Sequence, residues 1–102
     1  MGQQNRLKLH EQLQLLCPNC YYQPPKNIQM TYPCIVYNKA GVIDLYAQDK
    51  KYLSRDEYMV TVIDRDPDSK IPEAVLNKFT MSSFQDEFVQ DNLHHTILTL
   101  NI

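Results

Sequence analysis

The pattern of apolar positions predicts a helix at the start of the chain. Between residues 4 and 16, Leu9, Leu13 and Leu16 recur at spacings of four and three, and mostly polar side chains separate them. This spacing places the three leucines on one face of a helix. We expect the helix to end near Leu16, because Pro18 cannot continue it.

The next segments predict a connector, a strand and an arm. Residues 17–31 contain three prolines, so we expect no regular structure there. Tyr32–Tyr37 is β-branched and aromatic, which predicts a strand beginning after Pro33. Asn38–Gly41 is typical of a turn. We interpret the charged, tyrosine-containing residues 42–55 as a long hairpin arm or loop.

The stretch Asp56–Asp64 shows the clearest strand pattern, with a period of two. One face carries Tyr58, Val60 and Val62, and the other carries Met59, Thr61 and Ile63. Because the second face is partly apolar, we expect this strand to be covered on both sides, by a helix or by a neighbouring subunit.

The C-terminal third predicts a short helix and a hairpin. Asp68 or Ser69 is suited to cap a helix over Lys70–Phe79. Strands are expected over Phe84–Val89 and Leu93–Ile102, with a tight turn between them. Residues 1–102 therefore predict a single α+β domain: a mostly antiparallel sheet of four to five strands with two helices on one face, in the order α-β-β-(β)-α-β-β.

Composition excludes several functions. The chain has only 2 glycines, so no glycine-rich phosphate loop is present, and its net charge of −2 does not favour nucleic-acid binding. No apolar run approaches the roughly 20 residues of a membrane span. Serines lie in expected turns without an accompanying base, and no pair of acidic residues stands out. We therefore expect a protein that is not an enzyme and binds no cofactor.

Two motifs suggest metal sites. Cys17-x-x-Cys20 resembles half of a zinc site, which Cys34 or a histidine could complete. The alternative, which we prefer, is that these cysteines are incidental thiols that bind no metal. The spacing Asp64-x-Asp66-x-Asp68 resembles a calcium loop but lacks its glycine and glutamate. We interpret these carboxylates as acceptors for backbone N–H groups where the strand ends and the helix begins, and we expect no metal.

Tyrosines provide the strongest indication of an interface. The chain has 7 tyrosines and no tryptophan, and several lie in the expected loops. Tyrosine is common at interfaces because it buries a large area and keeps a polar tip. The alternative is that some of these rings cover the core of this domain. The candidate interface residues are Tyr21, Tyr22, Tyr46, Lys50, Lys51, Tyr52 and Arg55.

The chain resembles small proteins of the head-to-tail joining region of tailed bacteriophages in three sequence segments: Tyr32–Tyr37, Tyr58–Pro72 and Asp91–His95. The order of elements is similar to the tail terminator, or tail completion, proteins of long-tailed phages such as lambda. This chain is shorter and has a proline- and cysteine-containing connector.

The resemblance implies a structural virion protein that assembles in the host cytoplasm into a homo-oligomeric ring, commonly a hexamer. Such a ring caps the tail tube and joins the tail to the head connector, so its partners are the major tail tube protein and the head-closure protein. DNA passes through the lumen without being specifically bound, and no membrane is involved. The alternatives are a head-closure or connector protein on the portal side, and a small zinc-binding interaction module.

Overall fold

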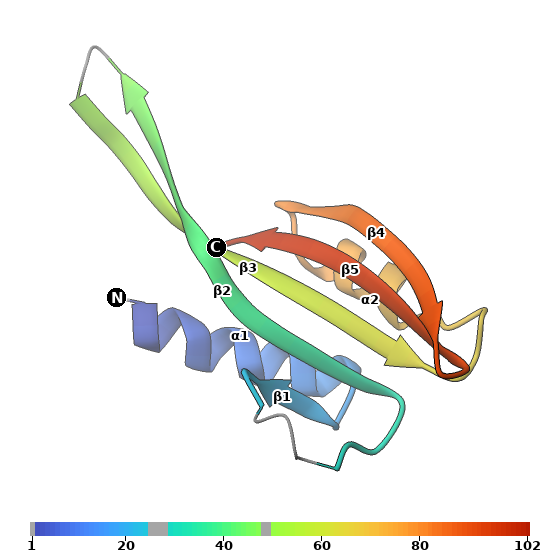
Figure 1. Cartoon of the computed structure of the whole chain (residues 1–102). Helices are drawn as coiled ribbons and strands as arrows, with labels where there is room; N and C mark the ends of the chain where they lie inside the picture. Colours follow the sequence, from blue (N-terminus) through green and yellow to red (C-terminus); the bar gives the residue numbers. More distant parts are fainter. Residues whose placement is uncertain (1, 25–28, 48–49) are drawn as a thin grey trace.

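The structure is a computed structural model that describes the backbone of residues 2–24, 29–47 and 50–102. Side chains are described for residues 6–24, 29–42 and 56–102. Five strands form one sheet in the order β1-β2-β3-β5-β4 (Figure 1). With two helices, this confirms the predicted α+β class and the mostly antiparallel sheet.

The bounds of the elements agree with most of the predicted segments. The two helices are α1 (Gly2–Leu16) and α2 (Ile71–Lys78). The strands are β1 (Cys20–Tyr22), β2 (Cys34–Ala47), β3 (Lys50–Asp64), β4 (Ser82–Gln90) and β5 (Leu93–Asn101).

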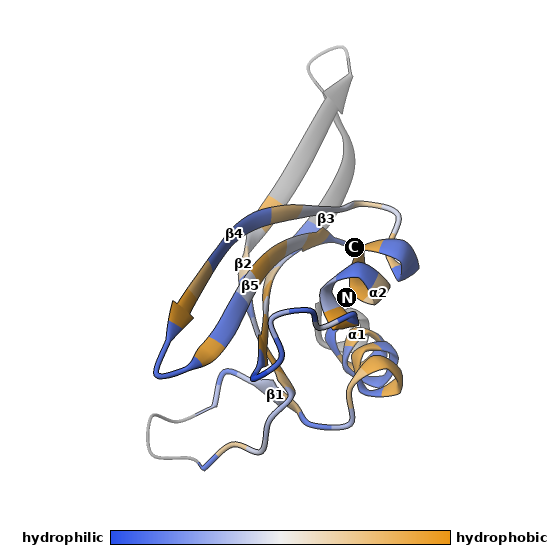
Figure 2. Ribbon diagram, turned by 90° about the vertical axis from the view of Figure 1, so that its right-hand side faces the viewer, coloured by the Kyte–Doolittle hydropathy of each residue, from blue (hydrophilic) through white to orange (hydrophobic). Residues whose placement is uncertain are grey.

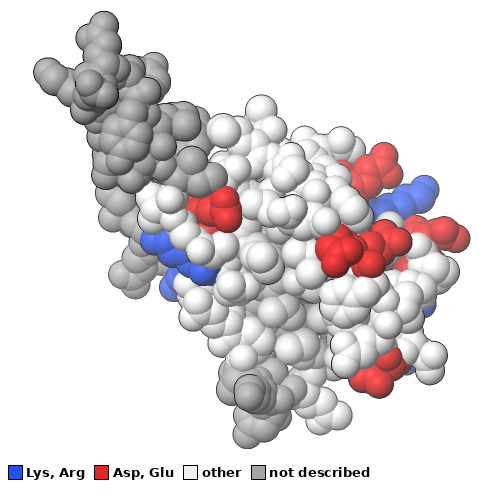
Figure 3. Space-filling view, turned by 45° about the horizontal axis from the view of Figure 1, so that its top comes forward, with Lys and Arg blue, Asp and Glu red and all other residues white. Residues whose placement is uncertain are grey.

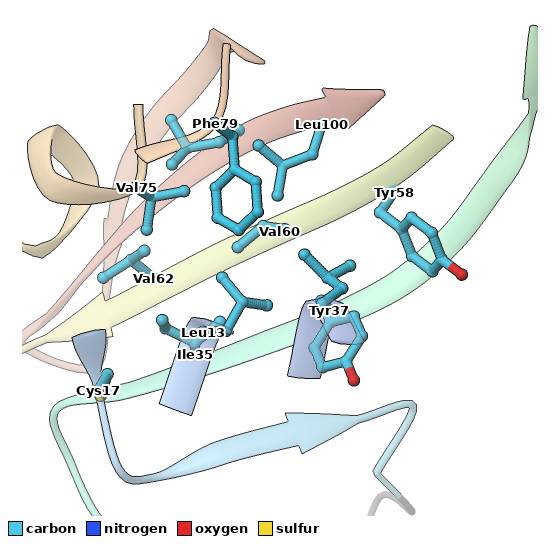
Figure 4. Packing of buried hydrophobic residues seen from close by; sticks show 12 residues of the cluster. Leu13, Cys17, Ile35, Tyr37, Tyr58, Val60, Val62, Val75, Phe79 and Leu100 are labelled. Carbon is cyan, nitrogen blue, oxygen red and sulfur yellow. The ribbon is translucent and has the colours of Figure 1, made fainter. Parts of the chain in front are cut away.

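Both helices cover the same face of the sheet, as predicted (Figure 2). Leu9 and Leu13 of α1 and Val75 of α2 are fully buried against side chains of the sheet. Of the two faces of β3, the one with Tyr58, Val60 and Val62 is also buried between the helices and the sheet (Figure 4). The core cluster consists of Leu9, Leu13, Cys17, Ile35, Tyr37, Tyr58, Val60, Val62, Val75, Phe79, Leu98 and Leu100.

The opposite face of β3 carries no helix in the described part of the chain (Figure 2). Met59 is 37% exposed there, whereas Ile63, near the end of the same strand, is 8% exposed. A helical cover on this side, one of the two expected, is therefore not seen among the described residues. Cover by a neighbouring subunit stays a prediction.

The prediction that residues 17–31 lack regular structure is wrong for β1. Cys20–Tyr22 pairs in parallel with residues 35–37 of β2, which makes the sheet mixed. Backbone hydrogen bonds continue at both ends of this strand, from Ile35 N to Asn19 O (2.9 Å) and from Gln23 N to Tyr37 O (3.0 Å). The prolines of the connector lie on either side of this strand and interrupt none of its bonds.

The expected turn at Asn38–Gly41 is also wrong, because β2 continues through it to Ala47. Lys39 pairs with Tyr58 and Gly41 pairs with Glu57, and a register shift accommodates Ala40 between them. Polar residues with turn propensity are thus held in a strand by cross-strand pairing and a β-bulge. Residues 42–47 of β2 pair with residues 50–56 of β3, and these paired strands form the expected hairpin arm.

The C-terminal hairpin has the expected tight turn. Asp91 and Asn92 have φ values of 54° and 63°, the left-handed pair typical of a type I′ turn. The cap of α2 differs from the prediction: Lys70 occupies the N-cap position and makes no side-chain capping bond. Ser69 lies one residue earlier, where its Oγ accepts a 3.4 Å hydrogen bond from Ile71 N.

Candidate interaction surfaces

The hairpin arm extends the molecule along one axis. Its strands pair from Val42–Asp56 to Ala47–Lys50, beyond the part of β3 that pairs with β5 (Figure 1). The overall dimensions are 49 × 24 × 23 Å, so the long axis is about twice the others. The side chains of the predicted interface residues on this arm lie outside the described residues: Tyr46, Lys50, Lys51, Tyr52 and Arg55.

The two other predicted tyrosines lie on opposite faces of β1. Tyr22 packs against the core: its ring centroid is 4.9 Å from that of Tyr37, and the Arg6 guanidinium lies 4.6 Å above it. This is the arrangement that the alternative, core-covering interpretation expects. Tyr21 is half-buried, and its hydroxyl oxygen accepts a 3.4 Å hydrogen bond from Thr31 N. Their part in an interface stays a prediction.

Strand β4 is an exposed edge of the sheet. It pairs with β5 on one side, and no strand in the described part of the chain pairs with its other side. Eight of its nine residues are exposed, including Phe84 at 54%, Phe88 at 38% and Val89 at 59%. It contains neither lysine nor proline, but it has two other features that commonly protect such edges: the acidic residues Asp86 and Glu87, and a register shift between Phe84 and Asp86. Sequence reasoning missed this surface, although polar residues between two phenylalanines were a signal for it.

The base of the arm holds two acceptors that lack donors. Lys39 Nζ forms a 3.4 Å salt bridge with Asp56 Oδ1. The other carboxylate oxygen, Asp56 Oδ2, and Asn101 Oδ1 are buried, and neither has a hydrogen-bond partner among the residues whose side chains are described. Buried polar atoms are nearly always satisfied, so each of these oxygens requires an explanation.

The thiols and a histidine gather at the end of α1 and the start of β1. His10 Nδ1 lies 2.6 Å from the Tyr37 hydroxyl and 3.9 Å from Cys20 Sγ. The Cys17 thiol donates to Pro33 O at 3.4 Å. Burial raises the pKa of Cys20 to about 12 and that of Cys34 to about 11. At neutral pH these cysteines are therefore protonated thiols, which are poor nucleophiles.

The aspartates after β3 accept local backbone hydrogen bonds. Asp66 N donates to Asp64 Oδ1 at 3.1 Å, and Asp68 N donates to Asp66 Oδ1 at 2.9 Å. These bonds confirm the interpretation of Asp64-x-Asp66-x-Asp68 as carboxylates that accept hydrogen bonds from backbone N–H groups. Within the residues that the structure describes, no group of three or more His, Cys, Asp or Glu side chains is placed to hold a metal ion.

A cavity of about 250 Å³ adjoins this loop, between α2 and the end of the β4–β5 hairpin. Its apolar lining includes Val62, Leu76 and Phe84. No lysine or arginine lines it; the polar residues are Asp64, Asp66, Ser69, Glu73, Glu87, His94 and Thr96. Figure 3 shows most of the acidic side chains on its visible face away from the end that bears the arm.

The two adjacent histidines have separate surroundings, as expected for neighbours on a strand. His94 lines the cavity, whereas His95 stacks on Phe88 with the ring centroids 4.6 Å apart.

None of the helices described is both long and apolar enough to cross a membrane.

The fold and these surfaces define a small α+β protein with a projecting hairpin and an exposed edge strand. Comparison with known protein families, with curated proteins and with solved structures gives no match for this chain.

Proposed function

We propose that this chain is a structural, non-enzymatic protein that assembles with copies of itself into a ring in the neck of a tailed bacteriophage. In this role it acts as a tail terminator: one face of the ring caps the tail tube, and the other contacts the head connector. The mechanism is geometric, since the ring stops growth of the tube and presents a new surface for joining.

The observation that carries the proposal is the hairpin arm. Residues 42–47 and 50–55 extend beyond the rest of the sheet, and a two-stranded ribbon by itself is only marginally stable in water. An arm of this kind gains stability when it packs on another molecule. The resemblance of the quoted sequence phrases to phage neck proteins supplies the biological setting.

Three further features support assembly. The β4 edge offers unpaired backbone groups, the uncovered sheet face is partly apolar, and the two acceptors at the base of the arm lack donors. The net charge of −2 suits a channel through which DNA slides, because phosphates are repelled by acidic surfaces.

The arm can be tested by deleting residues 44–54 and closing the hairpin with a short turn. We expect the intact chain to have the mass of a ring, several times 12.0 kDa, by light scattering, and the deletion variant to be a monomer. The variant should keep its far-UV circular dichroism and a cooperative melting transition, because the core cluster lies outside the deleted segment. Rings and tail joining that survive the deletion would contradict the proposal.

Imaging of particles assembled without this protein distinguishes the two positions in the neck. Overlong, unjoined tails are the expected result, because a missing terminator leaves the tube growing. Normal tails beside leaking heads would instead assign the protein to head closure. Normal, infectious particles would contradict both.

A further inference from the structure

We propose that strand β4 of one copy pairs with the arm segment of β3, residues 50–55, of the next copy. This inference rests on the proposed function, which it deepens by naming the two surfaces that meet in the ring. The β4 edge is then occupied by a second copy of this chain.

Both surfaces offer free backbone groups. β3 pairs with β5 only over Glu57–Asp64, with a last pair of backbone bonds between Asp56 and Ile102 (2.7 and 2.9 Å). Residues 50–55 therefore pair only with β2 in the described part of the chain. The outer side of β4 likewise pairs with no strand among the described residues, although Glu87 N donates a 2.7 Å hydrogen bond to Asp86 Oδ1. Two free edges can satisfy one another by strand addition.

The charges of the two segments are complementary. Residues 50–55 contain three basic residues, Lys50, Lys51 and Arg55, and no acidic one. β4 contains Asp86 and Glu87, both exposed, and no basic residue. Oppositely charged side chains across paired strands are favourable, and like charges are not. The pairing of β4 with a second β4 would instead place four carboxylates at one junction.

The topology makes this contact intermolecular and open-ended. Within one chain β5 separates β4 from β3, so the two edges cannot meet. When the arm of one copy binds β4 of another, the pair still has one free arm and one free β4. Such a heterologous contact forms a ring when its rotation closes, and an open filament when it does not. The exposed rings of Phe84 and Phe88 add apolar area to the same edge.

Charge reversal on each surface tests the inference. We expect Asp86→Lys/Glu87→Lys and Lys50→Glu/Lys51→Glu each to shift the light-scattering mass from that of a ring to 12.0 kDa. The matched controls are Glu11→Lys/Glu73→Lys and Lys8→Glu/Lys78→Glu, which make the same change in net charge at positions outside both surfaces. The controls should stay rings, and thermal melting should show that all four variants are folded.

Mixing the two defective variants identifies the contact. In this mixture the native arm fits the native β4, and the reversed arm fits the reversed β4, so both junctions between the two variants are compatible. We expect the mixture to recover the ring mass, several times 12.0 kDa, although each variant alone stays at 12.0 kDa. A combined variant carrying all four substitutions should regain the ring mass, because the charges are complementary again.

The outcomes separate this inference from the proposed function. A ring that persists in both charge-reversal variants would contradict the proposed strand pairing but not the proposed function. An arm variant that still forms dimers by itself would show that β4 pairs with β4, which also overturns the inference. A wild-type chain that is monomeric both in solution and in the particle would overturn both.

Discussion

Two residues with left-handed backbone close the C-terminal hairpin. Asp91 and Asn92 connect β4 to β5, and this turn fixes the register that places Leu98 and Leu100 in the core. Asparagine and aspartate tolerate this conformation better than other residues with a Cβ, and glycine adopts it at no steric cost. The turn therefore determines which side chains of β5 face the helices.

The turn gives a stability prediction at the residue scale. Asn92→Ala should lower the free energy of unfolding by about 1 kcal/mol, because alanine strains the positive φ, whereas Asn92→Gly should leave it unchanged or raise it. Urea denaturation followed by circular dichroism measures both. Equal losses in the two variants would show that the asparagine side chain, and not its backbone, matters.

Among the elements, α1 is held by a narrow apolar stripe. Leu9 and Leu13 are 1% and 0% exposed, whereas Leu15, on the same helix, is 78% exposed. The helix has no acidic residue in its first turn and no basic residue in its last, so favourable interactions with the helix dipole add little. Its docking depends mainly on the buried leucines.

Truncation of these leucines tests this dependence. Leu13→Ala should lower the free energy of unfolding by about 2–5 kcal/mol, since it leaves a cavity beneath the helix. Leu15→Ala is the matched control and should change it by less than about 0.5 kcal/mol. Similar effects of the two substitutions on the urea midpoint would contradict the observed docking face of α1.

Elements with strong periodicity were predictable from the sequence, and those that depend on distant partners were not. The leucine spacing of α1 and the alternation of β3 correctly identified Leu13 and Val60 as core residues. β1 has only three residues, too few for a periodic signal, and it exists because β2 lies beside it. Similarly, Asn38–Gly41 has turn composition but is held in a strand by pairing with β3.

The candidate surfaces, too, were predictable where the local sequence indicates them and not where they depend on distant strands. The arm could be located because its charged and tyrosine residues depart from a core pattern. The polar residues between two phenylalanines indicated that β4 is exposed, but its place at the edge could not be predicted, because the sequence contains no signal for the order of strands in a sheet. Only the topology shows that β4, and not β5, lies at the edge.

At the scale of the whole molecule, the Cys20 thiol and the Tyr37 hydroxyl make the free energy of unfolding depend on pH in the alkaline range. Burial raises the pKa of Cys20 from 9.0 to about 12 and, against an opposing effect of Arg6, that of Tyr37 from 10.0 to about 12. The folded chain therefore holds these protons more tightly than the unfolded chain. Stability is at its full value below about pH 9 and falls as the pH rises toward 12.

The prediction is a melting temperature that is flat near pH 8 and lower by about 5 °C or more at pH 10.5, the equivalent of about 1 kcal/mol. Calorimetry in the presence of a reductant measures it. Tyr37→Phe should melt lower at pH 8, because the bond to His10 is lost, but should decline less with pH. A wild-type curve that stays flat to pH 10.5 would contradict these raised pKa values.

The one-sided helix layer has a consequence for any closed assembly of this chain. Since α1 and α2 both cover the same side of the sheet, the two broad surfaces of a subunit differ: one carries both helices, and the other carries no helix in the described part of the chain (Figure 2). Rotational symmetry repeats whichever orientation the first contact selects. A single junction would thus decide, for every copy at once, which of the two surfaces lines the bore and which faces outward.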